Sequence, residues 1–297
     1  MLRNCLKVIL PGWAALAAAA APAPAQEPPP ETLRIVFIAY ENPDQLLDDV
    51  KPVLEYLKPK VGAEIRHFTA TDYGAVVEAL RNKSADVGFM GPLQYVLAHA
   101  QSGAEAILGE IYSGKSTYVS RIFVRKDSGI TKPEDLRGKT IAFVDPVSSS
   151  GYLYPLEIFR SRGLIQKAED AETFFRRIYM PGGDEPAIGA VVHGFADAAG
   201  VGQYAFNLLR PEDRDRVTWI AESEPIPSHC VGVRKDLNKE TVEKIRAALL
   251  ALNEGPNRRL LENLYNVDGY VRVTHENFKG VERLARQYGF IKKIDPR

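Results

Sequence analysis

The first third of the chain alternates between apolar runs of strand length and apolar residues spaced as on one face of a helix. An apolar run over residues 33–39 predicts a strand, and residues 46–57 show helical spacing. Pro52 predicts that this helix is interrupted or begins late, because proline removes a backbone donor and clashes with the preceding turn. The same patterns predict strands at 63–68, 86–90 and 106–112, and helices at 73–82 and 94–101. Strands that alternate with helices favour βαβ units around a mostly parallel sheet.

The alternation restarts in the second part of the chain. It predicts strands at 118–124, 140–144, 173–179, 196–201, 216–221 and 230–233, a capped turn at 132–136, a helix at 185–193, and closing helical segments at 239–253, 257–265 and 276–287. Residues 79–88 and 190–199 echo each other, since each reads as a helix end, a polar turn and an Ala-Asp pair entering an apolar strand. Two similar α/β halves, the second inserted into the first, would explain the echo; a single continuous sheet is the alternative. The two-half interpretation predicts one lobe from 33–117 and 226–297 and another from 118–225.

The N-terminus has the pattern of a cleaved export signal. An apolar run over residues 8–21 follows two basic residues, and small residues around Ala25 suit a cleavage site. We expect residues 1–25 to be removed and 26–32 to form a disordered leader to a periplasmic protein. An uncleaved anchor is the alternative, although the run is shorter than the roughly 20 residues of a membrane span. Since the next cysteine after the run is Cys230, a lipid-anchored form is not expected.

Charge and cysteine content exclude several classes of function. Residues 1–25 carry two basic residues and no acidic one, so their removal leaves 36 basic against 38 acidic residues, a net charge of −2. Without a basic patch or run, nucleic acid is not an expected partner. Cys230 would be the one cysteine left, so about 270 residues must fold on a core without an internal disulfide, and we expect a monomer. Cys230 and His229 look like a metal pair, but the other histidines are scattered, so no metal or cofactor is predicted.

The segment 139–155 carries the clearest candidate chemistry. It reads as a strand over 140–144, a tight turn, and then Ser148, Ser149 and Ser150 at the start of a helix. The first backbone N–H groups of a helix lack intrahelical partners, and the helix dipole is positive there. Together with three hydroxyls, these groups would bind a small oxyanion. The alternative is that one serine is an ordinary N-cap and the others are loop residues.

A series of motifs extends over nearly the whole chain beyond the N-terminal segment. They are Thr71-Asp-Tyr73 before a helix, Ala85-Asp86-Val-Gly, Tyr118 ahead of 122–128, the turn at 132–139, the serine segment 145–155, Gly194-Phe-Ala-Asp197, and Ile226-Pro227 ahead of 233–237. The Asp-Pro-x-Ser-x-Ser-Gly-x-x-x-Pro pattern of 145–155 is fairly specific, whereas the Leu-Arg-Gly-Lys turn is shared by many binding proteins. With these motifs the chain resembles the periplasmic substrate-binding proteins of phosphate, phosphite and phosphonate ABC transporters.

The resemblance implies a type II-like binding fold of two lobes, each a mixed sheet flanked by helices, which close over a ligand at the hinge. It places an anion site on Ser148, Ser149 and Ser150, with hydroxyls from Tyr73 and Tyr118 across the cleft, and it implies an ABC permease as partner. The patterning agrees, because Tyr73 would begin a helix of the first lobe and Tyr118 lies at the proposed crossover. A tyrosine near a helix start is otherwise a packing residue.

Three positions depart from family members that bind aminoalkyl phosphonates. Asp184 stands where the resemblance implies a histidine, and Tyr204 and His229 fall near the acidic residues that would hold an ammonium group, so poor binding of 2-aminoethylphosphonate is implied. An ionised Asp184 would repel a phosphoryl dianion unless it points away, binds a cationic tail or accepts the proton of a monoanionic ligand. A simple N-cap for the helix at 185–193 is equally open. His229 would be a hydrogen-bonding residue at the hinge, whose charged form an adjacent oxyanion would favour.

No arrangement of residues indicates catalysis. The Gly-x-Ser-x-Gly pattern is absent, no histidine is placed by sequence to serve Ser149, and metal-ligand clusters typical of phosphate ester hydrolysis are missing. Glu157 and Asp184 could form paired carboxylates, although no spacing demands it. We therefore predict a binding protein, not an enzyme, that delivers a phosphorus oxyanion to an ABC importer. A ligand-sensing module that biases a membrane signalling partner is the alternative.

Overall fold

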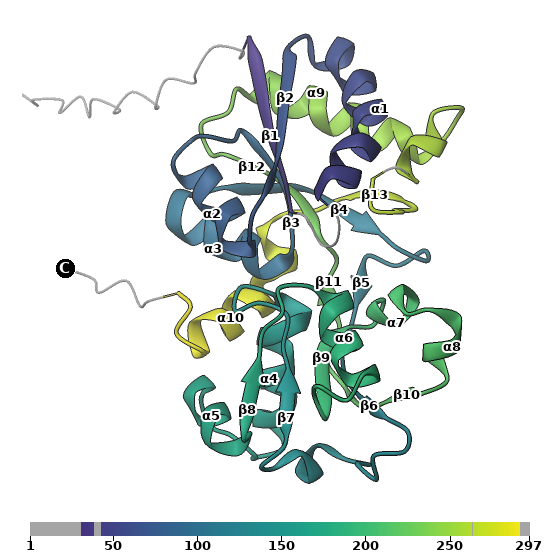
Figure 1. Cartoon of the computed structure of the whole chain (residues 1–297). Helices are drawn as coiled ribbons and strands as arrows, with labels where there is room; N and C mark the ends of the chain where they lie inside the picture. Colours follow the sequence, from purple (N-terminus) through teal and green to yellow (C-terminus); the bar gives the residue numbers. More distant parts are fainter. Residues whose placement is uncertain (1–30, 39–42, 263, 292–297) are drawn as a thin grey trace, which may run out of the picture.

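The computed structural model of the chain describes residues 31–38, 43–262 and 264–291, which form two sheets with helices around each (Figure 1). The predicted signal segment, residues 1–25, and nearly all of the predicted leader lie outside the described residues. The first sheet has, in spatial order, β13 (Gly269–Arg272), β4 (Glu105–Ile111), β12 (Cys230–Val233), β3 (Val87–Met90), β1 (Thr32–Ile38) and β2 (Glu64–Ala70). The second has β10 (Val217–Glu222), β6 (Ser120–Arg125), β9 (Ala198–Gly202), β7 (Thr140–Ala142) and β8 (Arg177–Tyr179). The chain passes between the sheets through β5 (Thr117–Tyr118) and returns through β11 (Ile226–Pro227), and these two strands pair with each other.

Both sheets are mixed. Strand β1 pairs in parallel with β2 and β3, while β12, β4 and β13 add antiparallel pairs. In the second sheet β7 pairs in parallel with β8 and β9, while β6 pairs antiparallel with both of its neighbours, β9 and β10. Two lobes that each hold a mixed sheet flanked by helices are thereby confirmed. The expectation of a mostly parallel sheet holds for the direction of β1 to β4 but not for the pairing, because β12 is inserted between β3 and β4 and pairs antiparallel with both.

Helices cover both faces of each sheet. In the first lobe α1 (Pro43–Val61) and α9 (Lys239–Leu250) share a core with one face, and α2 (Tyr73–Arg81) and α3 (Pro92–Ser102) with the other. In the second lobe α4 (Tyr154–Ser161) and α5 (Ala171–Phe174) lie on one face and α6 (Asp184–Val192) on the other. Strand β1 is a nearly continuous apolar run because both its faces are covered: Phe37 packs on the α1 side and Val36 on the α2 side. Among the described residues, none of the helices combines the length and apolar character needed to cross a membrane.

Helix α1 runs through Pro52 without a break, contrary to the prediction. Pro52 lies on the exposed side of the helix, whereas Val50, Val53 and Leu54 are buried against the sheet and α9. A proline inside a helix costs about 3 kcal/mol. Full burial of each large apolar side chain returns roughly 1.5–3 kcal/mol, so packing of this face outweighs the lost backbone bond.

Two other predicted elements differ from the structure. The predicted helix at 257–265 is one 3₁₀ turn, Arg258–Leu261, because Tyr265 and Asn266 adopt left-handed φ values of 58° and 53°. Strand β13 follows it and was not predicted, since four residues at a sheet edge leave little periodic signal. The predicted strand at 173–179 begins as α5, whose Phe174 is buried in the core, and becomes a strand at β8. The other predicted elements are found within a few residues of their expected ends.

The Ala-Asp echo has a structural counterpart in each lobe. Asp86 precedes β3, and its Oδ2 accepts a 2.8 Å hydrogen bond from the backbone N–H of Arg34 in β1. Asp197 precedes β9, and its Oδ2 accepts a 2.8 Å hydrogen bond from the backbone N–H of Thr140 in β7. In both lobes, therefore, the carboxylate joins the starts of two adjacent parallel strands.

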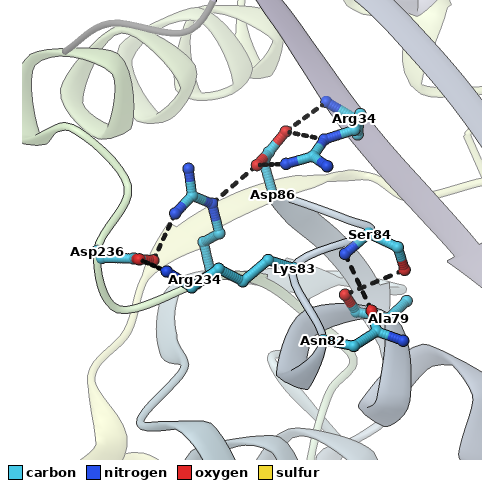
Figure 2. A network of polar contacts seen from close by, with 8 residues as sticks. All are labelled: Arg34, Ala79, Asn82, Lys83, Ser84, Asp86, Arg234 and Asp236. Atoms are coloured by element: carbon cyan, nitrogen blue, oxygen red, sulfur yellow. Dashed lines mark hydrogen bonds and ion pairs between the residues drawn. The ribbon is translucent and has the colours of Figure 1, made fainter. Parts of the chain in front are cut away.

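Asp86 also anchors a network of ion pairs in the first lobe (Figure 2). Its carboxylate accepts bonds of 2.7 Å from Arg34 Nη2 and 2.8 Å from Arg234 Nε, and Arg234 continues to Asp236, which also pairs with Lys83. Burial alone would raise the pKa of Asp86, but the hydrogen bonds from both arginines outweigh it and hold the pKa below its ordinary value. The network ties β1 and β3 to the segment that follows β12.

Helix α10 (Lys279–Gln287) connects the lobes at a second place (Figure 1). It packs along α3 of the first lobe. Just past its end, Tyr288 donates a 2.9 Å hydrogen bond to Glu157 Oε2 in α4 of the second lobe. The lobes are therefore joined both by β5 and β11 and by α10.

Candidate ligand-binding cleft

A cavity of about 520 Å³ lies between the lobes. All eight residues predicted to contact a ligand line it: Tyr73, Tyr118, Ser148, Ser149, Ser150, Asp184, Tyr204 and His229. The lining also includes Asp49, Glu262 and Asp268, but within the described part of the chain it includes no lysine or arginine. A bound anion would therefore depend on hydroxyls and backbone N–H groups for its stabilisation, not on cationic side chains.

Local hydrogen bonds between side-chain oxygens and backbone N–H groups shape the serine loop, residues 145–151. Asp145 Oδ1 accepts a 2.7 Å bond from the N–H of Val147, and Ser148 then acts as an N-cap whose Oγ accepts a 3.0 Å bond from the N–H of Gly151. Residues Ser149–Leu153 form a π-helical turn that continues into α4, instead of the regular helix start that the sequence predicts. Gly151 is required here, because a Cβ would lie 2.3 Å from the side chain of Val144.

The three serines have different contacts. Ser148 is the N-cap that the simpler interpretation expected of one serine. Ser149 Oγ accepts a 2.8 Å hydrogen bond from the backbone N–H of Leu93, which belongs to α3 in the other lobe. Ser150 uses its carbonyl oxygen to accept a 2.7 Å bond from Ser120 Oγ, and its own hydroxyl faces the cleft beside Gly202. Ser149 and Ser150 therefore make specific contacts, which the alternative of loop residues without a role did not expect.

The two tyrosines face the serine loop and are almost fully buried. Tyr73 begins α2, whose N-cap Asp72 accepts a 2.8 Å bond from the N–H of Ala75, and Tyr118 lies in β5. Burial raises the pKa of both phenols, and the charge of Asp184 raises both further. Hydrogen bonding of Tyr118 with Ser150, and with Ser149, opposes the increase but does not cancel it. Both phenols therefore keep their protons at neutral pH and remain hydrogen-bond donors.

Gln94 holds the first-lobe wall together and was not identified from the sequence. It is fully buried; its Oε1 accepts a 2.6 Å bond from the N–H of Gly91, and its Nε2 donates a 2.7 Å bond to the carbonyl of Tyr73. The starts of α2 and α3 are thereby fixed beside each other. A glutamine three residues after the N-cap is a capping-box pattern, which is the signal that could have indicated it.

Asp184 points into the cleft. It is the first residue of α6, whose N-cap is Gly183, so the interpretation of Asp184 as a simple N-cap is wrong. Its Oδ1 accepts a 3.0 Å hydrogen bond from the backbone N–H of Gly202. The side chain lines the cavity instead of pointing away from it, and its charge raises the pKa of Tyr73 and Tyr118 on the opposite wall.

His229 and Tyr204 lie beside Tyr112 on the same cavity. The imidazole of His229 stacks on Tyr118 with ring centroids 5.5 Å apart, and Tyr204 lies 5.7 Å from Tyr112 by the same measure. Burial lowers the pKa of His229 to about 4, so its ring is neutral at pH 7. Neither side chain carries a negative charge that could hold an ammonium group.

Glu110 is a buried acid behind His229 that sequence reasoning missed. Its side chain is about 1% exposed, and its Oε2 lies 4.0 Å from His229 Nδ1 and accepts a 2.6 Å bond from the hydroxyl of Tyr112. Burial raises the pKa of Glu110 to about 7, and the Tyr112 hydrogen bond only partly opposes this. A glutamate within the otherwise apolar segment 106–112 was the available signal.

The two carboxylates considered as a pair from the sequence, Glu157 and Asp184, lie in different surroundings. Glu157 bonds to Arg160 and Tyr288 and does not line the cavity with Asp184, so the paired-carboxylate alternative is wrong. The residues described by the structure include no group of three histidine, cysteine or acidic side chains placed to hold a metal ion. Cys230, which follows His229, is buried in β12.

Two α/β lobes that enclose a hydroxyl-lined cleft define a solute-binding fold. The same fold is found in PhnD1 of Prochlorococcus marinus in complex with methylphosphonate, which matches with a TM-score of 0.76 and 18% identity over 86% of this chain and 98% of that one. A phosphonate transporter binding protein of Pseudomonas aeruginosa matches with a TM-score of 0.75 and 22% identity over 85% of each chain.

The family model for the periplasmic substrate-binding protein of phosphonate ABC transporters matches residues 35–278, and the chain belongs to this family. Its sequence is 31% identical to the phosphate-import protein PhnD of Mycolicibacterium smegmatis over 186 residues, which are 61% of this chain and 56% of that protein. It is 26% identical to the phosphonates-binding periplasmic protein of Escherichia coli over 79% of this chain and 70% of that one. The family is one of periplasmic substrate-binding proteins of ABC transporters.

Proposed function

We propose that the protein captures a small phosphorus oxyanion, such as a phosphonate or phosphite, in the periplasm and delivers it to an ABC importer. The observation that carries this proposal is the convergence of Ser148–Ser150 with Tyr73 and Tyr118 on one buried cavity between two lobes. Hydroxyls in such a site are hydrogen-bond donors, and removal of water strengthens each bond to an anion. Family membership supports the importer over the signalling module.

Closure of the lobes would couple binding to delivery. In this proposal residues 33–117 and 226–297 form one lobe and 118–225 the other, which agrees with the membership of the two sheets. Ser149 and Leu93 meet across the boundary, so ligand capture would favour the closed arrangement. The exported form would begin near Ala25, remain a monomer, and have no catalytic activity.

The proposal is tested by ligand-induced stabilisation. Purified protein is screened by thermal shift against phosphate, phosphite, methylphosphonate, a phosphate monoester and methanesulfonate, and hits are confirmed by calorimetry. A ligand at about 100 times its Kd stabilises the folded state by about 2.7 kcal/mol, a shift of several degrees. We expect at least one phosphorus oxyanion to produce this shift.

A variant with Ser148, Ser149 and Ser150 replaced by alanine should lose the shift. Ser161→Ala is the matched control, since it removes a hydroxyl from the end of the same helical segment and outside the cavity. Unchanged stabilisation of the triple variant, or no stabilisation of the unmodified protein by any phosphorus oxyanion, would refute the proposal.

A further inference from the structure

Asp184 places a hydrogen-bond acceptor among donors. Its Oδ1 is held by the N–H of Gly202, and a Cβ built at Gly202 would lie 3.2 Å from Ser150 Oγ and 3.7 Å from Asp184 Oδ1, so both oxygens flank the same point. Tyr73 and Tyr118 line the same cavity as Asp184 from the opposite wall, and the charge of Asp184 raises the pKa of both phenols. The carboxylate is therefore part of the hydroxyl cluster where an anion would bind.

This position decides between the two remaining roles for Asp184. A cationic ligand tail would reach the carboxylate only by entering the hydroxyl cluster that the anionic head requires. A head group with its own proton has no such conflict. It can accept bonds from the serine and tyrosine hydroxyls through its ionised oxygens and donate its remaining proton to Asp184.

We propose that Asp184 selects oxyanions that carry an acidic proton, such as the monoanion of methylphosphonate, and rejects fully ionised sulfonates of the same size and charge. This inference rests on the proposed function and deepens it by naming the protonation state of the ligand. The discriminating contact is P–O–H donating to the Asp184 carboxylate.

The physical basis is one shared proton. Methylphosphonate monoanion and methanesulfonate have the same charge, and their tetrahedral heads are similar in shape. The phosphonate offers two ionised acceptor oxygens and one O–H donor, whereas the sulfonate offers three acceptors. With the sulfonate, a carboxylate oxygen and a sulfonate oxygen face each other without a proton, which is repulsive in a site that excludes water. With the phosphonate, the same contact is a charge-assisted hydrogen bond.

The test compares these two ligands by calorimetry at about pH 6, below the second ionisation of the phosphonate. We expect the unmodified protein to bind methylphosphonate at least about 100-fold more tightly than methanesulfonate. This ratio of Kd values corresponds to a difference of about 2.8 kcal/mol in binding free energy. Asp184→Asn keeps an oxygen for the N–H of Gly202 but adds an amide donor. We expect this variant to gain methanesulfonate binding and to reduce the ratio below about tenfold. Glu185→Gln removes an equal charge from the next, exposed residue and should leave the ratio unchanged.

A pH series adds a second readout. Binding of methylphosphonate should weaken as pH rises and the ligand loses its second proton, and Asp184→Asn should flatten this dependence. Facing Asp184, Tyr73 and Tyr118 stay protonated up to high pH because burial raises their pKa, and His229 stays neutral. Burial also raises the pKa of Asp145 above its ordinary value of 3.8, so this carboxyl is a further titratable group in the serine loop.

Glu110 has a pKa of about 7 and would titrate in the same window. Glu110→Gln is therefore measured in parallel, and the pH dependence should persist in it. Its loss there, together with persistence in Asp184→Asn, would assign the dependence to Glu110 and overturn the inference.

The outcomes separate the inference from the proposed function. Comparable binding of methylphosphonate and methanesulfonate by the unmodified protein, or an unchanged ratio in a folded Asp184→Asn variant, refutes the role of Asp184 alone. Absence of binding to every phosphorus oxyanion refutes the proposed function and this inference with it. If Asp184→Asn does not fold, the unmodified protein still tests the inference. A preference for methylphosphonate over methanesulfonate that weakens as pH rises supports the role of Asp184, and equal binding of the two ligands refutes it.

Discussion

Ser149→Ala should weaken ligand binding without lowering the stability of the ligand-free protein. The Oγ of Ser149 accepts the N–H of Leu93 at 2.8 Å across the cleft, so this bond exists only while the lobes are together. In an open protein, water replaces it. Truncation leaves a buried donor unsatisfied in the closed form alone, at a cost of about 1–3 kcal/mol. This cost corresponds to a loss of about 5–150-fold in affinity.

Ser148→Ala is the matched comparison. The Oγ of Ser148 caps the N–H of Gly151 within one lobe, so its removal should lower ligand-free stability by about 1 kcal/mol, or roughly 2–4 °C in Tm for a protein of this size. Calorimetry with the best ligand from the screen and thermal unfolding without ligand give both numbers for each variant. Equal ligand-free destabilisation by the two substitutions, with Ser149→Ala leaving Kd unchanged, would refute the assignment of the Ser149 bond to closure.

Two further predictions concern the part of the cavity around Tyr204 and His229 and the buried Glu110 beside His229. Tyr204 and neutral His229 supply no negative charge at the positions where the resemblance implies acidic residues, so 2-aminoethylphosphonate should bind at least about tenfold more weakly than ethylphosphonate. Submicromolar binding of the amine by calorimetry would contradict this and would indicate that Asp49, Glu262 or Asp268 of the lining holds the ammonium group. Burial raises the pKa of Glu110 from 4.5 to about 7, so the stability that its neutral form contributes is fully present below 4.5 and is lost as pH rises through 7. Glu110→Gln should therefore gain stability relative to the unmodified protein by roughly 3 kcal/mol between pH 4.5 and 8, at 1.36 kcal/mol per pKa unit, measured by urea unfolding. A difference that is the same at both pH values would show that Glu110 does not titrate in the folded protein.

Much of the fold was predictable because the periodic patterns and the motifs of segment 145–155 are local. Pro52 was misjudged because the decisive term is packing of the opposite helix face, which depends on α9 far along the chain. Strand β13 exists through pairing with β4, and such tertiary stabilisation leaves no mark on four residues.

In the candidate site, too, the residues with local sequence signals could be predicted and those that depend on tertiary contacts could not. Sequence reasoning identified eight side chains that the structure brings around one cavity, and their contact with a ligand remains a prediction. It could not identify Leu93, whose backbone N–H meets Ser149, because a backbone donor carries no residue-specific signal. Glu110 was missed because its neighbour His229 immediately precedes β12, a strand distant in the sequence that pairs with β4 only in the folded chain.

The contact of α10 with both lobes restricts the direction in which the cleft can open. Strands β5 and β11 alone would let one lobe both swing and twist relative to the other. A twist that lifts α4 from α10 breaks the bond between Tyr288 and Glu157, whereas a swing that pivots near both connections preserves it. With two connections, the proposed closure would follow one direction and would bring Ser148–Ser150 toward Tyr73 and Tyr118 in the same relative orientation each time.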